Sequence, residues 1–272
     1  MDHSLQISSN FGSLSPSIGQ KICDLFSCRR IGESLSFHGI VGIERQWLLT
    51  NLVHLQSSIY SLDCYGESIW DARVDVVEDL WGSIHKRLRA FGFTYHEIEF
   101  LIADMRAYQD IEAQLRDGIS PSKMNIKTFY DLKTCDVRLS RRIIEMVERG
   151  SCSSRANTLW ECYDLSCEIV DDLSDFWEDL SNFNCNRFLI SLRDRGYAET
   201  RAEYLHFLER IITRTREIST VGEESGLSEV NQIGCWILES VRNARVVLDQ
   251  LGDDMGKKSC QDETSFVRPV TL

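Results

Sequence analysis

The sequence predicts an all-α protein in which one domain forms a helical bundle. Apolar residues recur with the helical period through most of the chain, and no alternating strand pattern persists anywhere. Only three prolines, Pro16, Pro121 and Pro269, interrupt the 272 residues, so long helices can run between them. The fractions of hydrophobic residues, 43%, and charged residues, 26%, are typical of a globular domain.

Each predicted helix is recognised by an apolar stripe and is bounded by turn residues such as Gly92 and Gly196. In chain order the predicted helices span 18–28, 44–65, 71–91, 96–115, 126–148, 156–180, 198–216 and 227–251. Thr158 and the serines at 153 and 154 are suited to cap the helix over 156–180. Because no linker divides the chain, we expect one helical domain over 18–258, with an N-terminal arm at 1–17 and a C-terminal tail at 259–272.

The charge and composition disfavour several classes of function. A net charge of -12 argues against non-specific binding to nucleic acid and against docking on an anionic membrane. No apolar run reaches the roughly 20 residues of a transmembrane helix. The first residues show no basic segment followed by an apolar run, so we expect no signal peptide. The ten cysteines form no CxxC pairs, which favours free thiols and a cytoplasmic protein.

The most informative pattern is a row of carboxylates in the predicted helix over 156–180. Asp171, Asp175 and Asp179 stand at i, i+4 and i+8, which places them along one helix face, and Asp164 and Glu168 continue the row. Like charges at this spacing repel, and aspartate has a poor helix propensity. Water or a bound cation must therefore offset the repulsion. Mg²⁺ is suited to the second role, because it prefers oxygen ligands and shares them with phosphates.

Two interpretations of this row remain open from the residues alone. Rows of charge are more often solvated helix faces. The neighbours, however, are large and apolar, including Phe176 and Trp177, which favours a helix that faces an internal cavity. Arg187 follows the row and could hold a phosphate bidentately. The basic run at Arg138, Arg141 and Arg142 is of a kind that more often forms a solvated helix face, but it would also suit a diphosphate.

The row resembles the second metal motif of class I isoprenoid synthases, whose ligands recur at i, i+4 and i+8. Within that superfamily the chain is most similar to the squalene/phytoene synthase branch. The similar segments are Ser34-Leu-Ser-Phe37, Asp63-Cys-Tyr-Gly-Glu67, Lys127-Thr-Phe-Tyr-Asp-Leu-Lys-Thr-Cys135, Asp175-Phe-Trp-Glu-Asp179 and Asn186-Arg187-Phe-Leu-Ile190. The segment from Asp63 to Glu67 looks like a reduced first acidic motif, with two carboxylates one turn apart.

The resemblance implies a single-domain isoprenoid synthase bundle around a central active-site cavity. It implies a prenyl diphosphate as substrate and three Mg²⁺ ions as cofactor. The catalytic metal ligands would be Asp63, Glu67, Asp171, Asp175 and Asp179. The diphosphate would be bound by Arg187, Arg138 and Arg142, and the pocket would be lined by Tyr60, Phe100, Trp160 and Phe176. A homodimer is compatible with the sequence.

Departures from the branch decide between three functional hypotheses. Leu35 and Tyr60 replace basic residues, and Ile126 and Cys135 replace tyrosines that serve the joining of two prenyl diphosphates. We therefore expect a terpene synthase that ionises one prenyl diphosphate and lets the carbocation cyclise or be quenched. The alternatives are a squalene/phytoene synthase-type prenyltransferase and a non-catalytic helical relative, the latter favoured by the reduced first motif.

Overall fold

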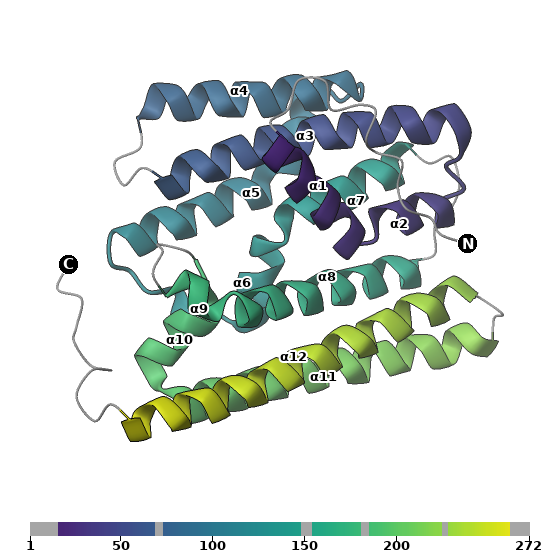
Figure 1. Ribbon diagram of the computed structural model, residues 1–272. Coiled ribbons are helices and arrows are strands. Elements are labelled where there is room, and N and C mark those ends of the chain that lie inside the picture. The colour runs from purple at the N-terminus through teal and green to yellow at the C-terminus, as the bar shows by residue number, and fades with distance from the viewer. Residues whose placement is uncertain (1–15, 69–72, 148–153, 181–184, 225–227, 262–272) are drawn as a thin grey trace.

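Every regular element in the described part of the chain is a helix, which confirms the all-α prediction (Figure 1). The computed structural model describes residues 16–68, 73–147, 154–180, 185–224 and 228–261. Within these ranges no strand occurs, and no helix is long and apolar enough to cross a membrane. The predicted arm at 1–17 and tail at 259–272 lie almost entirely outside the described residues.

The helices form two groups along the chain. The first comprises α1 (Pro16–Cys28), α2 (Ile31–Phe37), α3 (Gly42–Ser68), α4 (Val74–Ala90), α5 (Tyr95–Arg116), the 3-10 turn η1 (Pro121–Lys123), α6 (Ile126–Lys133) and α7 (Cys135–Val147). The second comprises α8 (Ser154–Ser174), α9 (Phe176–Asp179), α10 (Arg187–Arg195), α11 (Tyr197–Glu224) and α12 (Ser228–Gln261). In Figure 1 the long hairpin of α11 and α12 lies along one side of α8, and α3, α4 and α5 lie on the other.

The buried side chains form two separate hydrophobic cores. The first core joins α1 to α5 with α7, and its fully buried members include Leu52 and Ile84. The second core packs α8 against α6 and α10 to α12, and Trp160 and Tyr204 are buried within it. Tyr108 of α5 packs against both clusters. Each amphipathic helix thus buries its apolar stripe in one core, and α5 lies where the two cores meet.

Two predicted helices are interrupted in the structure. The helix predicted over 126–148 is divided at Thr134, whose hydroxyl donates to the Tyr130 carbonyl at 2.9 Å. The helix predicted over 156–180 is divided at Asp175, where ψ is 5°. Asp175 N still donates to Asp171 O at 2.9 Å, and Asp179 N donates to Asp175 O at 2.8 Å. The helical spacing of the acidic row therefore survives the break.

Two short helices were not predicted, because each is too brief to show a clear apolar period. Helix α2 follows Arg30, which adopts a left-handed conformation with φ 51°. Helix α10 begins after Asn186, whose side chain accepts a hydrogen bond from Leu189 N at 3.1 Å, and ends at Gly196 with φ 82°. The sequence shows the residues that cap α10, which are Asn186 and Gly196. The turn before α2 has no glycine, so no residue signals it in the sequence.

The N-terminus of α5 offers a test of local stability. Thr94 and Glu97 form a capping box, in which Thr94 Oγ1 accepts from Glu97 N and Glu97 Oε2 accepts from Thr94 N at 2.7 Å. We expect Thr94→Ala to lower the free energy of unfolding by about 1 kcal/mol, because orphan backbone donors lose their partner. Urea denaturation measures this change. Thr213→Ala, at an exposed position inside α11, is the control and should change stability by less than about 0.5 kcal/mol.

Candidate functional site

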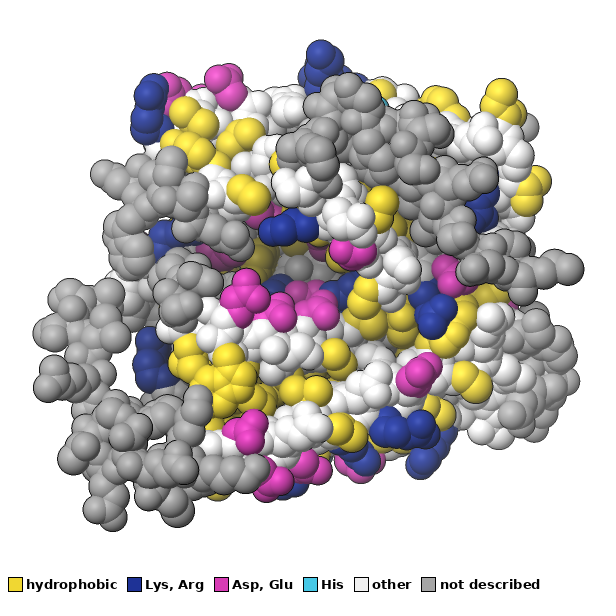
Figure 2. Space-filling view, viewed as in Figure 1, with side chains coloured by type: hydrophobic (Ala, Val, Ile, Leu, Met, Phe, Trp, Pro, Cys, Tyr) yellow, Lys and Arg dark blue, Asp and Glu magenta, His cyan; other side chains and the backbone are white. Residues whose placement is uncertain are grey.

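A cavity of about 380 Å³ lies where the two cores meet. Its described lining contains eight acidic residues: Asp63, Glu112, Asp136, Glu168, Asp171, Asp172, Asp175 and Asp179. The basic residues of the same lining are Arg29, Arg116 and Lys133. Figure 2 shows acidic side chains gathered beside a hollow near the centre of the molecule. The excess of carboxylates gives the cavity a negative potential that attracts cations.

The first carboxylate of the α8 face is neutralised by a buried arginine. Arg141 of α7 donates to both oxygens of Asp164, from Nε at 2.6 Å and from Nη2 at 2.7 Å, and both side chains are buried. The same guanidinium donates to the Arg29 carbonyl at 2.8 Å and lies 4.0 Å from the ring centroid of Trp160. Asp164 therefore holds α7 and the end of α1 against α8.

Arg29, which follows α1, neutralises the next two carboxylates. Its Nη2 lies 2.5 Å from Glu168 Oε2 and 2.7 Å from Asp171 Oδ2, while Nη1 donates to the Asp164 carbonyl at 2.7 Å. Burial disfavours the charged guanidinium, but Glu168 and Asp171 outweigh this effect and raise the pKa of Arg29. Glu168, Asp171 and the Asp164 carbonyl thus share the guanidinium of Arg29, which lies in the turn after α1.

Lys133 at the end of α6 neutralises the adjacent part of the row. Its ammonium group contacts Asp172 and lies 3.6 Å from Glu168. Asp172 also accepts from the Tyr130 hydroxyl at 2.8 Å and from Arg187 N at 2.9 Å. Burial alone would lower the pKa of Lys133, but the charge of Asp172 raises it above its ordinary value. Asp172 is therefore a fully partnered, buried carboxylate.

The far end of the row is formed by Asp175 and Asp179. No ion pair to Asp175 occurs among the described side chains, and Asp179 accepts a hydrogen bond from Asn186 Nδ2 at 2.8 Å. Lost hydration, followed by the charges of Asp179 and Glu178, raises the pKa of Asp175. Desolvation raises the pKa of Asp171 to about 7, although the Arg29 guanidinium acts in the opposite direction. Burial thus disfavours the charged forms of Asp171 and Asp175.

The reduced first motif lines the same cavity from α3. Asp63, Tyr60 and Gly66 all belong to its wall, opposite the row on α8 and α9. Arg116 of α5 reaches this wall and donates from Nη2 to the Gly66 carbonyl at 2.9 Å. The backbone of Glu67 lies in α3, but its side chain is outside the described residues. The structure therefore brings Asp63 together with Asp171, Asp175 and Asp179, as the resemblance implies.

The three arginines predicted to bind a diphosphate do not line this cavity. Arg187 is fully buried, and its Nη1 and Nη2 each lie 3.0 Å from a carboxylate oxygen of Glu203. Arg138 and Arg142 both face Asp104, at 3.8 Å and 3.2 Å. The prediction for these arginines is corrected: their charges are matched by carboxylates elsewhere in the fold. The basic groups that do line the cavity are Arg29, Arg116 and Lys133.

The predicted aromatic lining is correct at one of four positions. Tyr60 lines the cavity. Phe100 does not, because its side chain is 69% exposed on the outer face of α5. Trp160 is buried in the second core beneath Arg141, and Phe176 is buried against Phe188 with ring centroids 5.9 Å apart. These two rings support the wall that carries the row, but they do not face the cavity.

The site residues that sequence reasoning missed are mainly basic. Lys133 stands within the segment 127–135 that carried part of the resemblance, so its proximity to the site could have been anticipated. Arg29 lies 142 residues before Asp171, and no local pattern connects them. Arg116 lies just beyond the end of the helix predicted over 96–115 and was not singled out. Long-range pairing of this kind appears only once the helices are packed.

Comparisons with known protein families, with curated proteins and with solved structures found no match to this chain. The site is therefore interpreted from its own chemistry. Within the described residues no three His, Cys, Asp or Glu side chains are already arranged around a common metal position. The available donors are carboxylate oxygens, which are the ligands that Mg²⁺ prefers and shares with phosphate oxygens. The chemistry of the donor set fits that ion.

The buried pair of Arg141 and Asp164 provides a test of the architecture around the site. We expect Asp164→Asn to lower the free energy of unfolding by about 3–5 kcal/mol, because the variant leaves a buried guanidinium without its anion. Chemical denaturation measures the loss. Glu209→Gln removes the anion of an ion pair with Arg245, in which Glu209 is 59% exposed, and should cost less than about 1 kcal/mol. Equal losses in the two variants would contradict the assignment.

Proposed function

We propose that this protein is a class I terpene synthase that ionises one linear prenyl diphosphate. The observation that supports this proposal best is that acidic side chains lie on two walls of one cavity. Asp63 of α3 shares a cavity with Asp171, Asp175 and Asp179 of α8 and α9, and basic side chains lie in the same lining. Carboxylates on two walls, with cations beside them, suit a ligand that carries metal ions and a diphosphate together.

The metal would be held by carboxylates on two walls of the cavity. Oxygen ligands would come from Asp175 and Asp179 on one wall and from Asp63 on the other. Asp171 could add its second carboxylate oxygen, because Arg29 contacts Oδ2. Bound Mg²⁺ supplies Lewis-acid stabilisation of the charge that develops on the departing diphosphate. Lost hydration, and then the charges of Asp179 and Glu178, raise the pKa of Asp175, and a bound cation would favour its charged form.

The diphosphate would be bound by the cations of the lining in place of the arginines first predicted. Arg116 lines the cavity with Asp63, its Nη2 donates to the Gly66 carbonyl, and a guanidinium has five N–H donors, so it could also donate to a phosphate oxygen. Arg29 and Lys133 stand beside the opposite wall, paired with carboxylates. Arg29 and Lys133 could donate charge-assisted hydrogen bonds to phosphate oxygens beside these carboxylates.

The apolar part of the lining would hold the hydrocarbon chain. Leu25, Ile59, Leu62, Met105 and Val137 contribute aliphatic surface to the same cavity. The rings of two tyrosines, at 60 and 108, stand among them. Aromatic faces stabilise a carbocation, and apolar walls delay its quenching by excluding water. The volume of about 380 Å³ lies within the usual range for small-molecule sites.

A non-catalytic role is the second candidate. It is favoured by the ion pairs that Arg29 and Lys133 already make with Glu168, Asp171 and Asp172. In a protein without a ligand these pairs would serve folding alone. The prenyltransferase alternative rests on the sequence resemblance. The two enzyme hypotheses share the metal site and differ in the product.

The decisive experiment is an assay of the purified full chain with Mg²⁺ and C10, C15 and C20 prenyl diphosphates, with and without a second prenyl acceptor. Extracts are analysed by gas chromatography with mass spectrometry, and released diphosphate is measured separately. A hydrocarbon or alcohol from a single substrate supports a terpene synthase. A product made of two prenyl units supports a prenyltransferase. If no substrate releases diphosphate, the non-catalytic role stands.

We expect Asp175→Ala to reduce diphosphate release at least about 100-fold, because it removes a metal ligand on which the charge of the leaving group depends. Glu178→Ala is the matched control. Glu178 lies on the same short helix but outside the cavity lining, so most of the activity should remain. Circular dichroism and thermal unfolding establish that both variants are folded. An active Asp175→Ala enzyme would contradict the metal assignment.

Binding of inorganic pyrophosphate with Mg²⁺ tests the diphosphate site without turnover. We expect Arg116→Gln to weaken this binding about 10-fold or more, measured by calorimetry, because it removes a charge-assisted hydrogen bond. Arg106→Gln is the control, since Arg106 is on the same helix, is 50% exposed and does not line this cavity. Equal affinities of the two variants would exclude Arg116 as a ligand of the diphosphate.

A further inference from the structure

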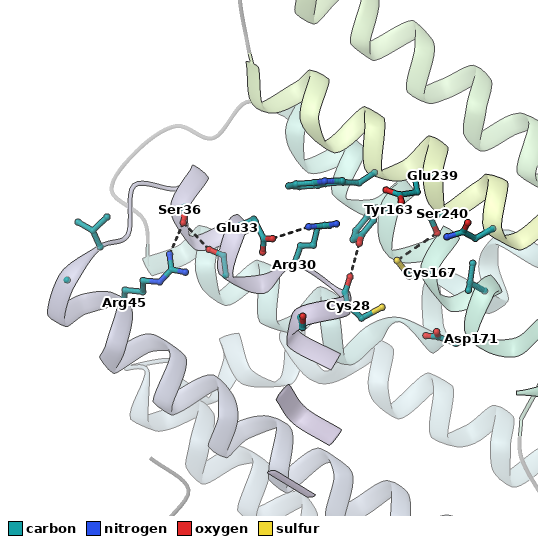
Figure 3. A pocket seen from close by; sticks show the side chains of 17 residues that line it. Cys28, Arg30, Glu33, Ser36, Arg45, Tyr163, Cys167, Asp171, Glu239 and Ser240 are labelled. Atoms are coloured by element: carbon teal, nitrogen blue, oxygen red, sulfur yellow. Dashed lines mark hydrogen bonds and ion pairs between the residues drawn. The ribbon is translucent and has the colours of Figure 1, made fainter. Parts of the chain in front are cut away.

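A second cavity, of about 800 Å³, opens between the α1–α2 corner, α8 and α12 (Figure 3). Cys28 and Cys167 both belong to its lining. Cys28 is the last residue of α1 and is exposed, whereas Cys167 of α8 is 5% exposed. Figure 3 shows both sulfur atoms on the side of the cavity that carries Asp171. Two thiols from segments far apart in the chain thus share one solvent-reachable wall.

The backbone holds these two thiols close together. The Tyr163 hydroxyl of α8 donates to the Cys28 carbonyl at 2.7 Å, which fixes the end of α1 against α8. Cys167 stands one turn after Tyr163, on the same face of the helix. The two thiols are close enough for each to shift the pKa of the other. Ser240 of α12 stands beside Cys167, with 4.0 Å between Oγ and Sγ.

The surroundings give the two thiols different chemical roles. The hydrogen bond with Cys167 lowers the pKa of Cys28 to about 6, with further help from the charge of Arg29 and against the effect of burial. The same contact and burial raise the pKa of Cys167. An accessible thiolate beside a protonated thiol is the arrangement in which one sulfur reacts first and the other resolves the product.

We propose that Cys28 and Cys167 form a reversible disulfide when the protein meets a peroxide. The Cys28 thiolate attacks hydrogen peroxide, the O–O bond breaks, and a sulfenic acid forms as hydroxide leaves. The Cys167 sulfur then attacks the Cys28 sulfur, the S–O bond breaks, and water leaves. In total two thiols lose two electrons and two protons, and one hydrogen peroxide becomes two waters. A dithiol reductant reverses the reaction by thiol–disulfide exchange.

This bond would join the same two segments that Arg29 already joins by ion pairs. Cys28 precedes Arg29 in the chain, and Cys167 precedes Glu168, the partner of Arg29 at 2.5 Å. A covalent link would hold Arg29 against the acidic row and keep α1 closed over α8. The oxidised protein should therefore unfold at a higher temperature than the reduced protein, because the link restricts the unfolded chain over a long loop.

The experiment treats the purified full chain with a small excess of hydrogen peroxide, alkylates the remaining thiols and maps the peptides by mass spectrometry. We expect one peptide pair that contains Cys28 linked to Cys167, is two hydrogens lighter than the free peptides and is lost after treatment with dithiothreitol. The thermal midpoint of unfolding should rise on oxidation and return on reduction. The cross-link is read by mass, so its outcome is independent of any activity on prenyl diphosphates.

Three variants complete the test. Cys28→Ser and Cys167→Ser should each abolish the linked peptide and the rise of the thermal midpoint. Cys64→Ser, at an exposed position of α3, should retain both. The proposal is overturned if wild-type Cys28 remains unreacted, is found only as a sulfinic acid, or is linked to a cysteine other than Cys167.

Discussion

The fold depends on the neutralisation of one face of α8. That face presents Asp164, Glu168, Asp171 and Asp172, a density of negative charge that an isolated helix would not tolerate. The compensating cations are Arg141 of α7, Lys133 of α6 and Arg29, which lies in the turn after α1. Buried ion pairs of this kind add little net stability, but removing one partner is costly, so they fix how the helices are placed. They also tie the first hydrophobic core to the second.

The same compensation explains where chemistry can occur. The cations are placed at one end of the carboxylate face, and Asp175 and Asp179 at the other end face Asp63 across a cavity. The first part of the row is paired with cations that fix the packing of the helices, and the next part lines the cavity together with Asp63. Asn186 connects these parts, because its amide donates to the Asp172 carbonyl at 2.6 Å and to Asp179 at 2.8 Å.

The sequence predicted what depends on local periodicity. The long helices follow from apolar stripes, and the acidic row follows from spacing alone, since i→i−4 hydrogen bonds continue through the break at Asp175. It did not predict contacts between distant segments, such as Arg29 with Asp171. Arg187 was misplaced for the same reason, because a basic residue beside an acidic row can face either the site or the core. Its ion pair with Glu203 on α11 holds it in the core. Phe100 shows that an apolar residue in a helix can remain exposed to solvent, which the sequence pattern does not reveal.

The position of the cavity between two separately packed cores has a consequence for how its size can change. A cavity inside one core enlarges only when lining side chains become smaller, and each such change disturbs the packing. Here the two walls belong to different cores, joined by Tyr108 and by the ion pairs of α8. A small rigid displacement of one core would widen or narrow the space while both interiors stay intact. The residues at the junction, such as Tyr108 and Arg29, also line the cavity, so they would set the length of a ligand that fits.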